Sequence, residues 1–304
     1  MQSDKSILLT FDVEDWFQVE NLKKSIPFSS WPTCESRVEE NTARLLDLLE
    51  SAREKCGASS RPPLRATFFV LGWLADRKPH LVRQIAARGH EIASHGFYHR
   101  LCGDCSPAVL RNDLSDSKKL LEDVTGEAVY GYRAPSFSIS PQVLELVAEC
   151  GYTYDSSYNS FGGNSRYGHI DVVRNGCGIA GRVPPSLLEL PVSNLEVAGR
   201  TIPMGGGGYF RLMPIWLFKR AVRTIINKEG AYLFYMHPWE IDPGQPRVKN
   251  LPLSYRFRHY VNLSSAASRL ADLLGAFFAH RFLTCREYID RVALSRTVGS
   301  HLDL

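Results

Sequence analysis

Four polar residues, each placed directly after a short apolar run, restrict the possible folds of this chain more than any other feature. They are Asp12 after residues 6–11, His95 after 91–94, Arg133 after 129–132 and His237 after 231–236. Short apolar runs bounded by turn-forming or polar residues are typical of buried strands. The carboxyl ends of parallel strands share one face of a barrel, where enzymes of this architecture keep their catalytic groups. We therefore expect the four side chains to converge.

Segments with helical spacing of apolar residues separate these runs. The expected helices span residues 39–52, 80–88, 107–125, 141–150, 215–228 and 264–280, and further strands are expected at 66–71, 188–190 and 283–284. Ser106 and Ser140 each precede a proline, which is a favoured start of a helix. Alternating strands and helices predict an α/β fold with a mainly parallel sheet.

The composition excludes several classes of protein. Hydrophobic residues make up 44% of the 304 residues and charged residues 22%, which is ordinary for a soluble enzyme. The formal net charge of +4 is too small to indicate a nucleic-acid partner. The apolar run at residues 7–10 is too short for a signal peptide, and no stretch of 18 apolar residues predicts a transmembrane segment. The expected location is the cytoplasm.

Seven cysteines are scattered along the chain without the spacing of a disulfide framework. They are Cys34, Cys56, Cys102, Cys105, Cys150, Cys177 and Cys285. Cys102 and Cys105 form a single CxxC motif, which a zinc finger or a redox site could use. No second CxxC or histidine pair follows at finger spacing, so we expect two thiols without a catalytic role.

The segment His95-Gly-Phe-Tyr-His99 is the strongest indication of a metal site. Side chains four residues apart share one face of a helical turn, so both imidazoles could reach one ion. The alternative is a pair of structural histidines, but a catalytic zinc site needs a third ligand, and Asp12, Glu14 and Asp15 follow another strand. One of these carboxylates could complete the ligand set, and another could act as general base.

These motifs together resemble those of the polysaccharide deacetylase family, also called the NodB homology group or carbohydrate esterase family 4. The matching segments are Thr10-Phe-Asp12-Val-Glu14-Asp15, Ser94-His95-Gly-Phe-Tyr-His99, Arg133-Ala-Pro135, Asp155-Ser-Ser157 and Met236-His237-Pro-Trp239. The resemblance extends from about residue 7 to about residue 240. It implies a distorted (β/α) barrel of the NodB type with seven parallel strands, and N-deacetylation of a carbohydrate as the activity.

The resemblance also implies roles for individual side chains. Asp12 would be the general base, held by charge-assisted hydrogen bonds from Arg133. His95 and His99 would bind a divalent metal, for which zinc is the first choice, although iron, cobalt and nickel also suit such ligands. His237 would protonate the leaving amine.

A second set of residues would bind or position the substrate. The backbone N–H near Ser136 would stabilise the oxyanion, and Pro135 belongs to the same motif. Tyr209 and Trp239 lie near motif positions, where aromatic rings can stack on sugar faces. Asp155 would orient another catalytic side chain.

The first motif departs from the family pattern, in which two adjacent aspartates serve as base and metal ligand. Val13 follows Asp12 here, so the ligand is either Glu14 or Asp15. Residues 12 and 14 point to the same side of a regular strand, which favours Glu14. Asp15 becomes the ligand if the strand has already turned. A third alternative is an impaired metal site in a fold without activity.

Three further segments resemble one subfamily, which is associated with exopolysaccharide loci that accompany PEP-CTERM protein sorting. They are residues 12–17, 205–211 and 258–263. The four glycines that open the second segment lack the Lys-Ser/Thr of a nucleotide-binding loop, so we expect them to allow close approach of backbone or substrate. We expect a deacetylase domain at residues 1–246 and an extension packed on it at 247–304.

The predicted function is therefore hydrolysis of N-acetyl groups on amino sugars during exopolysaccharide biosynthesis. The expected partner is an acetylated amino-sugar polymer or its lipid-linked oligosaccharide precursor. Two alternatives stay open: an O-acetyl esterase or ureide amidohydrolase of the same fold, and a non-catalytic glycan-binding protein. A lipid-linked substrate would add a peripheral position at the inner membrane to the expected cytoplasmic location.

Overall fold

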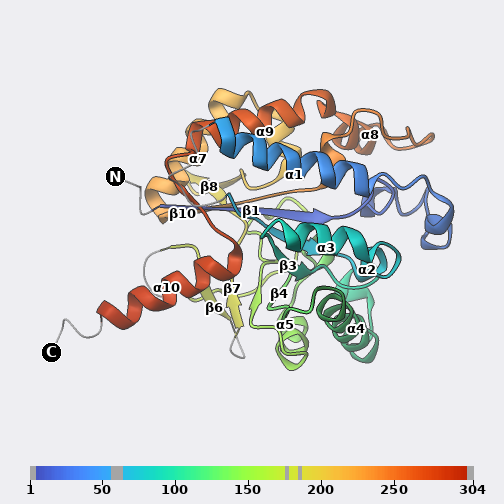
Figure 1. Ribbon diagram of the computed structural model, residues 1–304, viewed down its shortest axis with the longest axis horizontal. Helices are drawn as coiled ribbons and strands as arrows, with labels where there is room; N and C mark the ends of the chain where they lie inside the picture. Colours follow the sequence, from blue (N-terminus) through green and yellow to red (C-terminus); the bar gives the residue numbers. More distant parts are fainter. Residues whose placement is uncertain (1–4, 56–63, 175–177, 184–186, 300–304) are drawn as a thin grey trace.

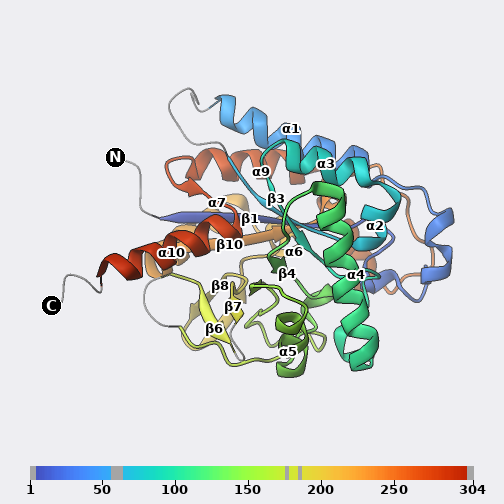
Figure 2. The same cartoon turned by 60° about the horizontal axis from the view of Figure 1, so that its bottom comes forward.

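A twisted sheet of mainly parallel strands forms the centre of the protein (Figures 1 and 2). The computed structural model describes residues 5–55, 64–174, 178–183 and 187–299. In these residues the strand order is β10 (Ala231–Met236), β1 (Ser6–Val13), β2 (Thr67–Val70), β3 (Glu91–Ser94), β4 (Gly131–Tyr132), β5 (Tyr154–Asp155), β7 (Leu187–Glu189) and β6 (Gly181–Val183). A ninth strand, β11 (Arg281–Phe282), pairs with β1 beside this path.

The strands from β10 to β7 are seven consecutive parallel neighbours, as the distorted (β/α) barrel predicts. Strand β6 closes the far edge by antiparallel pairing with β7. The chain that leaves β7 turns back toward the opposite edge, where the Ser193 N–H donates to the Leu233 carbonyl of β10 at 3.3 Å. The curled sheet therefore brings its two ends close together.

Strand β1 is central because its side chains are apolar on both faces. All of its residues are buried, and it has parallel partners on both sides. A run without polar alternation is what a strand covered on both faces requires. The hydroxyl of Thr10 donates to the Phe234 carbonyl at 2.9 Å, which satisfies this buried polar side chain.

Helices cover both faces of the sheet (Figure 1). The longer ones are α1 (Val38–Lys55), α4 (Pro107–Thr125), α7 (Ile215–Glu229), α9 (Leu263–Phe277) and α10 (Cys285–Gly299). The shorter ones are α2 (Gly72–Arg77), α3 (Pro79–Ala87), α5 (Pro141–Glu149), α6 (Gly207–Leu212) and α8 (Leu253–Tyr260). Helix α9 packs between α1 and α7, whereas α4 packs against α2, α3 and α5.

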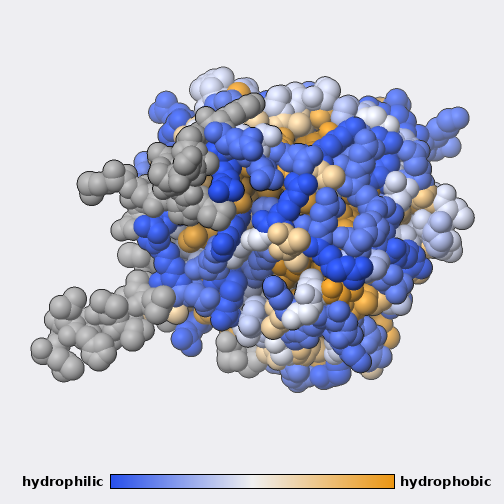
Figure 3. All heavy atoms as spheres, in the orientation of Figure 1, coloured by the Kyte–Doolittle hydropathy of each residue, from blue (hydrophilic) through white to orange (hydrophobic). Residues whose placement is uncertain are grey.

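The predicted serine caps are present at two of these helices. The Ser106 hydroxyl accepts from the Val109 N–H at the start of α4, and the Ser140 hydroxyl accepts from the Val143 N–H at the start of α5. Each cap satisfies a backbone donor that the first turn leaves without a helical partner. The face of the molecule drawn in Figure 3 is largely hydrophilic, as expected when the apolar sides of helices face the sheet.

Some short elements were not predicted, or lie beside their predicted positions. Strand β11 lies just before the strand expected at residues 283–284. Small elements such as β5, the hairpin of β8 (Asn194–Val197) and β9 (Arg200–Pro203), and α6 carry no long apolar pattern. Several 3-10 turns complete the chain: η1 (Glu20–Leu22), η2 (Phe28–Thr33), η4 (Cys102–Asp104), η5 (Pro135–Phe137) and η6 (Pro238–Ile241).

The C-terminal part of the chain packs on the same sheet. Strand β11 extends the edge of β1, and Cys285, Tyr288 and Ile289 of α10 join a core cluster with Leu8. The boundary expected at residue 246 stays a prediction. Within the described residues, no helix is both long and apolar enough to cross a membrane.

The cysteines that the structure describes are all free thiols. Cys102 is buried with its sulfur 3.4 Å from the Tyr132 hydroxyl, and burial raises the pKa of its thiol to about 12. A thiol in that state is a poor nucleophile and a poor metal ligand. Cys56 and Cys177 lie outside the described residues.

Candidate functional site

The side chains that follow β1, β3 and β10 converge at the carboxyl end of the sheet, as predicted from the sequence. Asp12, Glu14, His95, His99 and His237 line one cavity of about 160 Å³. The cavity therefore combines carboxylates and imidazoles from three separate strands.

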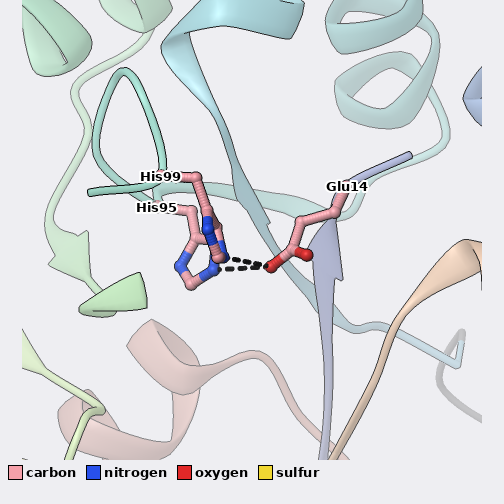
Figure 4. Close-up of side chains that lie close together, drawn as sticks. All are labelled: Glu14, His95 and His99. Carbon is pink, nitrogen blue, oxygen red and sulfur yellow. Dashed lines mark hydrogen bonds and ion pairs between the residues drawn. The ribbon is translucent and has the colours of Figure 1, made fainter. Parts of the chain in front are cut away.

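Glu14, His95 and His99 form a group that could hold a metal ion (Figure 4). The Nε2 atoms of both histidines lie 3.0 Å from Oε1 of Glu14, and the three ligand atoms all lie within 4.8 Å of one another. All three side chains are buried. Burial opposes the charge on Glu14, but His99 and the other neighbouring histidines outweigh this and hold the pKa of that carboxyl well below its usual range.

The ring of His95 is fixed by a second contact on its far side. Its Nδ1 atom lies 2.8 Å from the carbonyl oxygen of Arg133. An Nδ1–H that donates to a backbone carbonyl leaves Nε2 with its lone pair toward Glu14. Metal-binding histidines usually donate their other ring N–H to a carbonyl or carboxylate in this way. The contact of His95 with the Arg133 carbonyl therefore shows that this group of side chains fits a divalent cation.

Residues 95–99 form an irregular loop and not the helical turn that the sequence suggested. Gly96 and His99 adopt left-handed conformations with φ of 72° and 52°. Asp113 of α4 holds the loop, because its carboxylate accepts the N–H groups of Phe97 and Tyr98 at 2.6 and 3.3 Å. His95 and His99 therefore come together because the left-handed Gly96 bends the loop and Asp113 of α4 holds it by hydrogen bonds. The left-handed His99 is the kind of strained residue that persists where the surroundings enforce it.

Asp15, the alternative ligand, lies outside this group. Its Oδ2 atom accepts from the Ser36 hydroxyl at 2.8 Å and from the backbone N–H groups of Arg37 and Val38 at 2.9 and 3.1 Å. The carboxylate thus satisfies donors at the start of α1, where negative charge is favoured. Because β1 stays regular through Val13, alternation directs Glu14 and not Asp15 to the side of Asp12.

Arg133 is fully buried and holds Asp12 in place. Its Nη1 donates to Oδ1 of Asp12 at 2.7 Å and to the Thr10 hydroxyl at 2.8 Å. Its Nε donates to the Ser156 carbonyl at 2.9 Å, and its Nη2 donates to the Ser156 hydroxyl at 2.8 Å. The guanidinium also lies 4.1 Å from the centre of the Phe69 ring. Every side of this buried cation therefore has a partner, which makes the position of the Asp12 carboxylate rigid.

Asp155 supports the loop that carries Arg133, and its expected role in orienting a catalytic side chain stays a prediction. Its carboxylate accepts from the N–H and the hydroxyl of Ser157 at 2.9 and 2.8 Å. The Ser157 hydroxyl in turn accepts from the Ala134 N–H at 2.8 Å. Asp155 therefore acts on the cavity through Ser157 and the backbone of Ala134, the residue next to Arg133.

His237 faces both carboxylates of the cavity. Its Nε2 atom lies 4.0 Å from Oδ2 of Asp12 and 3.7 Å from Oε1 of Glu14, while Nδ1 lies 2.9 Å from Oε1 of Glu240. Burial alone would lower the pKa of His237, but Glu14, Glu240 and Asp12 outweigh it and raise the pKa to about 9. This raised pKa favours the protonated imidazole, which is the form that a proton donor requires.

Glu240 was not predicted, although it lies in the short turn η6 directly after His237. Its Oε2 atom accepts from Nε of Arg211 at 2.7 Å, so an ion pair buried at both ends orients the His237 ring. Burial opposes its charge, but Arg211 and His237 outweigh this and lower the pKa of Glu240 to about 2. In the sequence, Glu240 could have been recognised by its position three residues after His237, which is the spacing of a capping box.

The glycine run allows the close approach that the sequence predicted. A Cβ atom at Gly207 would lie 2.3 Å from Oε1 of Glu240, and one at Gly206 would lie 2.7 Å from the Tyr235 hydroxyl. Helix α6 can therefore pack its first turn directly on the residues beside His237. Only a residue without a side chain fits this space.

Replacing Gly207 by alanine is expected to destabilise the protein, because the new methyl group overlaps the Glu240 carboxylate that is already paired with Arg211. Overpacking of this kind lowers the free energy of unfolding by about 1–3 kcal/mol. Gly208→Ala is the matched control, since a Cβ there meets nothing within 4 Å. Urea unfolding of both variants tests the expectation, and equal stabilities would contradict it.

The residues expected to bind substrate divide into two groups. Ser136 and Trp239 line the cavity, whereas the buried Pro135 and the partly exposed Tyr209 of α6 are not part of its lining. Ser136 adopts a left-handed conformation with φ of 52°. Trp239 stacks on His237 with ring centres 5.2 Å apart, and its buried Nε1–H has no hydrogen-bond partner among the described residues.

A second cavity of about 320 Å³ adjoins the first. The two share Val19, Glu20 and His99 in their walls. The second cavity is lined in part by the aromatic residues Phe17, Phe28, Trp31 and Tyr98, and Phe28 is 45% exposed. The Nε2 atom of Gln18, which also lines it, is buried and has no partner among the residues described. This cavity thus places aromatic rings beside the cavity that contains Asp12 and His237.

Comparison with protein families gives two matches. Residues 1–154 match the family described as Polysaccharide deacetylase, and residues 156–290 match a domain of unknown function, DUF3473. The first match covers 154 of the 304 residues, just over half of the chain. All residues of the Glu14, His95 and His99 group fall inside it.

Curated relatives and a solved structure agree with this match. A peptidoglycan-N-acetylglucosamine deacetylase of Bacillus cereus is 33% identical over 111 residues, 36% of this chain and 47% of that protein. A chitooligosaccharide deacetylase of Bradyrhizobium sp. is 31% identical over 87 residues, 28% of this chain and 40% of that protein. The match to this chain thus spans less than half the length of these relatives.

The overall fold is shared with a Mycobacterium smegmatis protein that carries a provisional polysaccharide deacetylase assignment. Its crystal structure superposes with a TM-score of 0.59 at 21% identity, over 97% of this chain and 92% of that one. The superposition includes the region of DUF3473, so the fold similarity extends beyond residues 1–154.

Proposed function

Because the chain belongs to the polysaccharide deacetylase family, we propose that it is a metal-dependent hydrolase that removes N-acetyl groups from amino sugars. The substrate is a polysaccharide or its lipid-linked precursor. One observation carries the proposal: Glu14, His95 and His99 group together in the cavity that also contains Asp12 and His237. Metal-assisted amide hydrolysis uses a Lewis acid, a general base and a general acid around the scissile amide, and this cavity offers candidate residues for each role.

Glu14, His95 and His99 are the proposed metal ligands, and zinc is the proposed ion. Two imidazoles and a carboxylate are a usual catalytic zinc set, which keeps a further position open. A divalent ion bound there would act as a Lewis acid toward the acetyl carbonyl. The hydrogen bond from His95 to the Arg133 carbonyl supports this assignment.

Asp12 and His237 are the proposed base and acid. As water attacks the acetyl carbonyl carbon, Asp12 takes a proton from the water. The carbon–nitrogen bond then breaks while His237 gives a proton to the departing nitrogen, and acetate and a free amine leave. Arg133 holds Asp12 by its hydrogen bond of 2.7 Å, and Glu240 orients His237 from the other side of its ring. The backbone at Ser136 is the proposed partner of the developing oxyanion.

The proposed substrate class follows from the relatives. Their names state peptidoglycan and chitooligosaccharide deacetylation, so acetylated glucosamine chains are the first substrates to try. Trp239 lines the cavity and stacks on His237, where such a sugar would bind. We place the activity in exopolysaccharide biosynthesis, in a cytoplasmic protein that meets its lipid-linked substrate at the inner membrane.

Acetate release from N-acetylglucosamine oligomers by the zinc-reconstituted protein is the direct test. The expected result is one acetate for each new amine, detected by a coupled acetate assay and an amine-reactive dye. O-acetylated oligosaccharides, assayed in parallel, distinguish an esterase. Absence of release from every acetylated sugar, with zinc shown to be bound, would refute the deacetylase proposal.

Phe28→Ala is expected to weaken oligomer binding selectively. Phe28 lies at the edge of the second cavity, where its ring packs on Trp31 and Tyr98 at 4.9 and 5.5 Å between ring centres. A neighbouring sugar that stacks on these rings would gain about 1 kcal/mol, so the KM for a tetramer should rise about fivefold. The KM for a monomer should stay unchanged.

Tyr130→Ala is the control for this prediction, because Tyr130 is also a half-exposed aromatic residue but lines neither cavity. Its KM for the tetramer should equal that of the wild type. An equal KM increase for monomer and tetramer in Phe28→Ala would show that the second cavity does not bind a neighbouring sugar.

A further inference from the structure

Helix α8 exposes large apolar side chains that no part of the described chain covers. Leu253 is 82% exposed and Phe257 is 59% exposed. They lie four residues apart and therefore on the same face of the helix. Only the end of α8 is anchored, through the buried His259. In Figure 1, α8 lies at the rim of the molecule, on the side toward which β1 points.

The chain around α8 is rich in basic residues. Residues 243–271 contain five Lys and Arg residues and no Asp or Glu. Lys249 and Arg256 are exposed, and among the described residues no carboxylate pairs with either of them. Exposed leucine and phenylalanine are therefore interspersed with uncompensated positive charge.

A further large apolar side chain is exposed on α7, the helix that follows α6 in the chain. Arg211 of α6 donates to the carbonyl oxygens of Arg258 and His259, so the end of α8 lies against α6. Trp216, five residues after Arg211, is 67% exposed in the first turn of α7. No acidic residue occurs between Glu196 and Glu229, the part of the chain that contains α6 and most of α7.

We infer that α8, together with the first turn of α7, is a docking surface for an anionic lipid bilayer. Basic residues beside exposed Leu, Phe and Trp are the composition of helices that lie in the membrane interface. The apolar side chains would enter the boundary between headgroups and acyl chains. Lys249 and Arg256 would contact the anionic headgroups, each adding about 1 kcal/mol, a factor of about five in partitioning.

The charge pattern favours a bilayer over a second copy of the chain. A symmetric dimer through α8 would bring the basic residues of both copies together, and like charges oppose such contact. An anionic surface instead complements them. The cavity wall includes Arg258 and His259 at the end of α8, so docking through this helix would set the cavity next to the headgroups. The inference builds on the membrane-peripheral location proposed above but does not depend on deacetylation.

Flotation of the full-length protein with vesicles tests the inference. The vesicles are phosphatidylcholine alone or phosphatidylcholine with about 30% phosphatidylglycerol, at about 0.1 M and about 1 M NaCl. The protein should float with the anionic vesicles at low salt and stay unbound at high salt or with the neutral vesicles. Leu253→Ser/Phe257→Ser should lower the partition coefficient at least tenfold, and Lys249→Ala/Arg256→Ala should lower it about 25-fold, the product of two fivefold losses.

Matched variants elsewhere on the surface make the test specific. Val109→Ser and Arg83→Ala change an exposed apolar residue on α4 and an exposed basic residue on α3, and both should float like the wild type. Activity on a soluble oligomer and the melting temperature of every variant separate loss of docking from loss of fold or of catalysis. Failure of the wild type to bind anionic vesicles, or equal flotation of all variants, would overturn the inference. Self-association that the Leu253→Ser/Phe257→Ser variant abolishes, without vesicle binding, would assign the surface to a second copy instead.

Discussion

Asp12→Asn is expected to lower kcat for acetate release by about 10³-fold, because it removes the proposed base and keeps the size of the side chain. The amide oxygen can still accept from Arg133, which lies 2.7 Å from Oδ1. Asparagine is therefore a better test than alanine, which would also leave the buried Nη1 of Arg133 without this hydrogen-bond acceptor, at a further cost of about 1–3 kcal/mol of stability. The measurements are kcat, zinc content and urea unfolding of the same preparation.

Thr10→Val is the control that separates the base from its support. It removes one hydrogen bond to Arg133 at 2.8 Å and leaves the Asp12 carboxylate in place. We expect a loss of kcat of less than about tenfold, of the size of one hydrogen bond. A folded, zinc-loaded Asp12→Asn protein that kept a tenth or more of the wild-type kcat would rule out Asp12 as the base.

The fold could be predicted from the sequence wherever an element carries its own apolar pattern. The runs that became β1, β2, β3 and β10 are continuous and apolar, and their helices have clear spacing. Strand β5 has two residues, and α8 exposes nearly all of its surface, so neither leaves a periodic signal. Such elements form because tertiary contacts with neighbouring elements stabilise them. Many of these neighbours are far away in the sequence, so a short sequence segment does not reveal them.

The sequence indicated which residues form the candidate site, but not the backbone conformation that brings them together. Alternation along β1 indicated that Asp12 and Glu14 share a side, and the regular strand through Val13 agrees with it. The convergence of His95 and His99 was predicted through a helical turn, whereas Asp113 of α4 shapes the loop by hydrogen bonds to its backbone. That interaction joins residues of two elements, which spacing alone does not indicate.

The supporting residues were the ones that sequence reasoning missed. Arg211 reaches Glu240 from α6, and Ser156 binds Arg133 through both its carbonyl and its hydroxyl. Neither pair has a characteristic spacing. Their importance comes from burial, because a buried charge needs a partner wherever the fold can supply one. The second set of contacts around a site is therefore known only once the tertiary structure is known.

Glu14→Gln is expected to lower zinc affinity by at least about 100-fold, because a neutral amide replaces the carboxylate between the two imidazoles. Oε1 of Glu14 lies 3.0 Å from Nε2 of His95 and of His99, and no other carboxylate joins their group in the described residues. The metal-to-protein ratio after dialysis, measured by emission spectroscopy, should fall from about one to near zero. Acetate release should fall with it.

Asp15→Ala is the matched variant, since it removes the neighbouring carboxylate that caps α1. The Ser36 hydroxyl and the N–H groups of Arg37 and Val38 lose their acceptor, so the free energy of unfolding should fall by about 2 kcal/mol. Its zinc stoichiometry should equal that of the wild type. The two adjacent acids would thus separate into one that binds metal and one that stabilises the fold. Loss of zinc from a folded Asp15→Ala protein, with zinc retained in Glu14→Gln, would reverse this assignment.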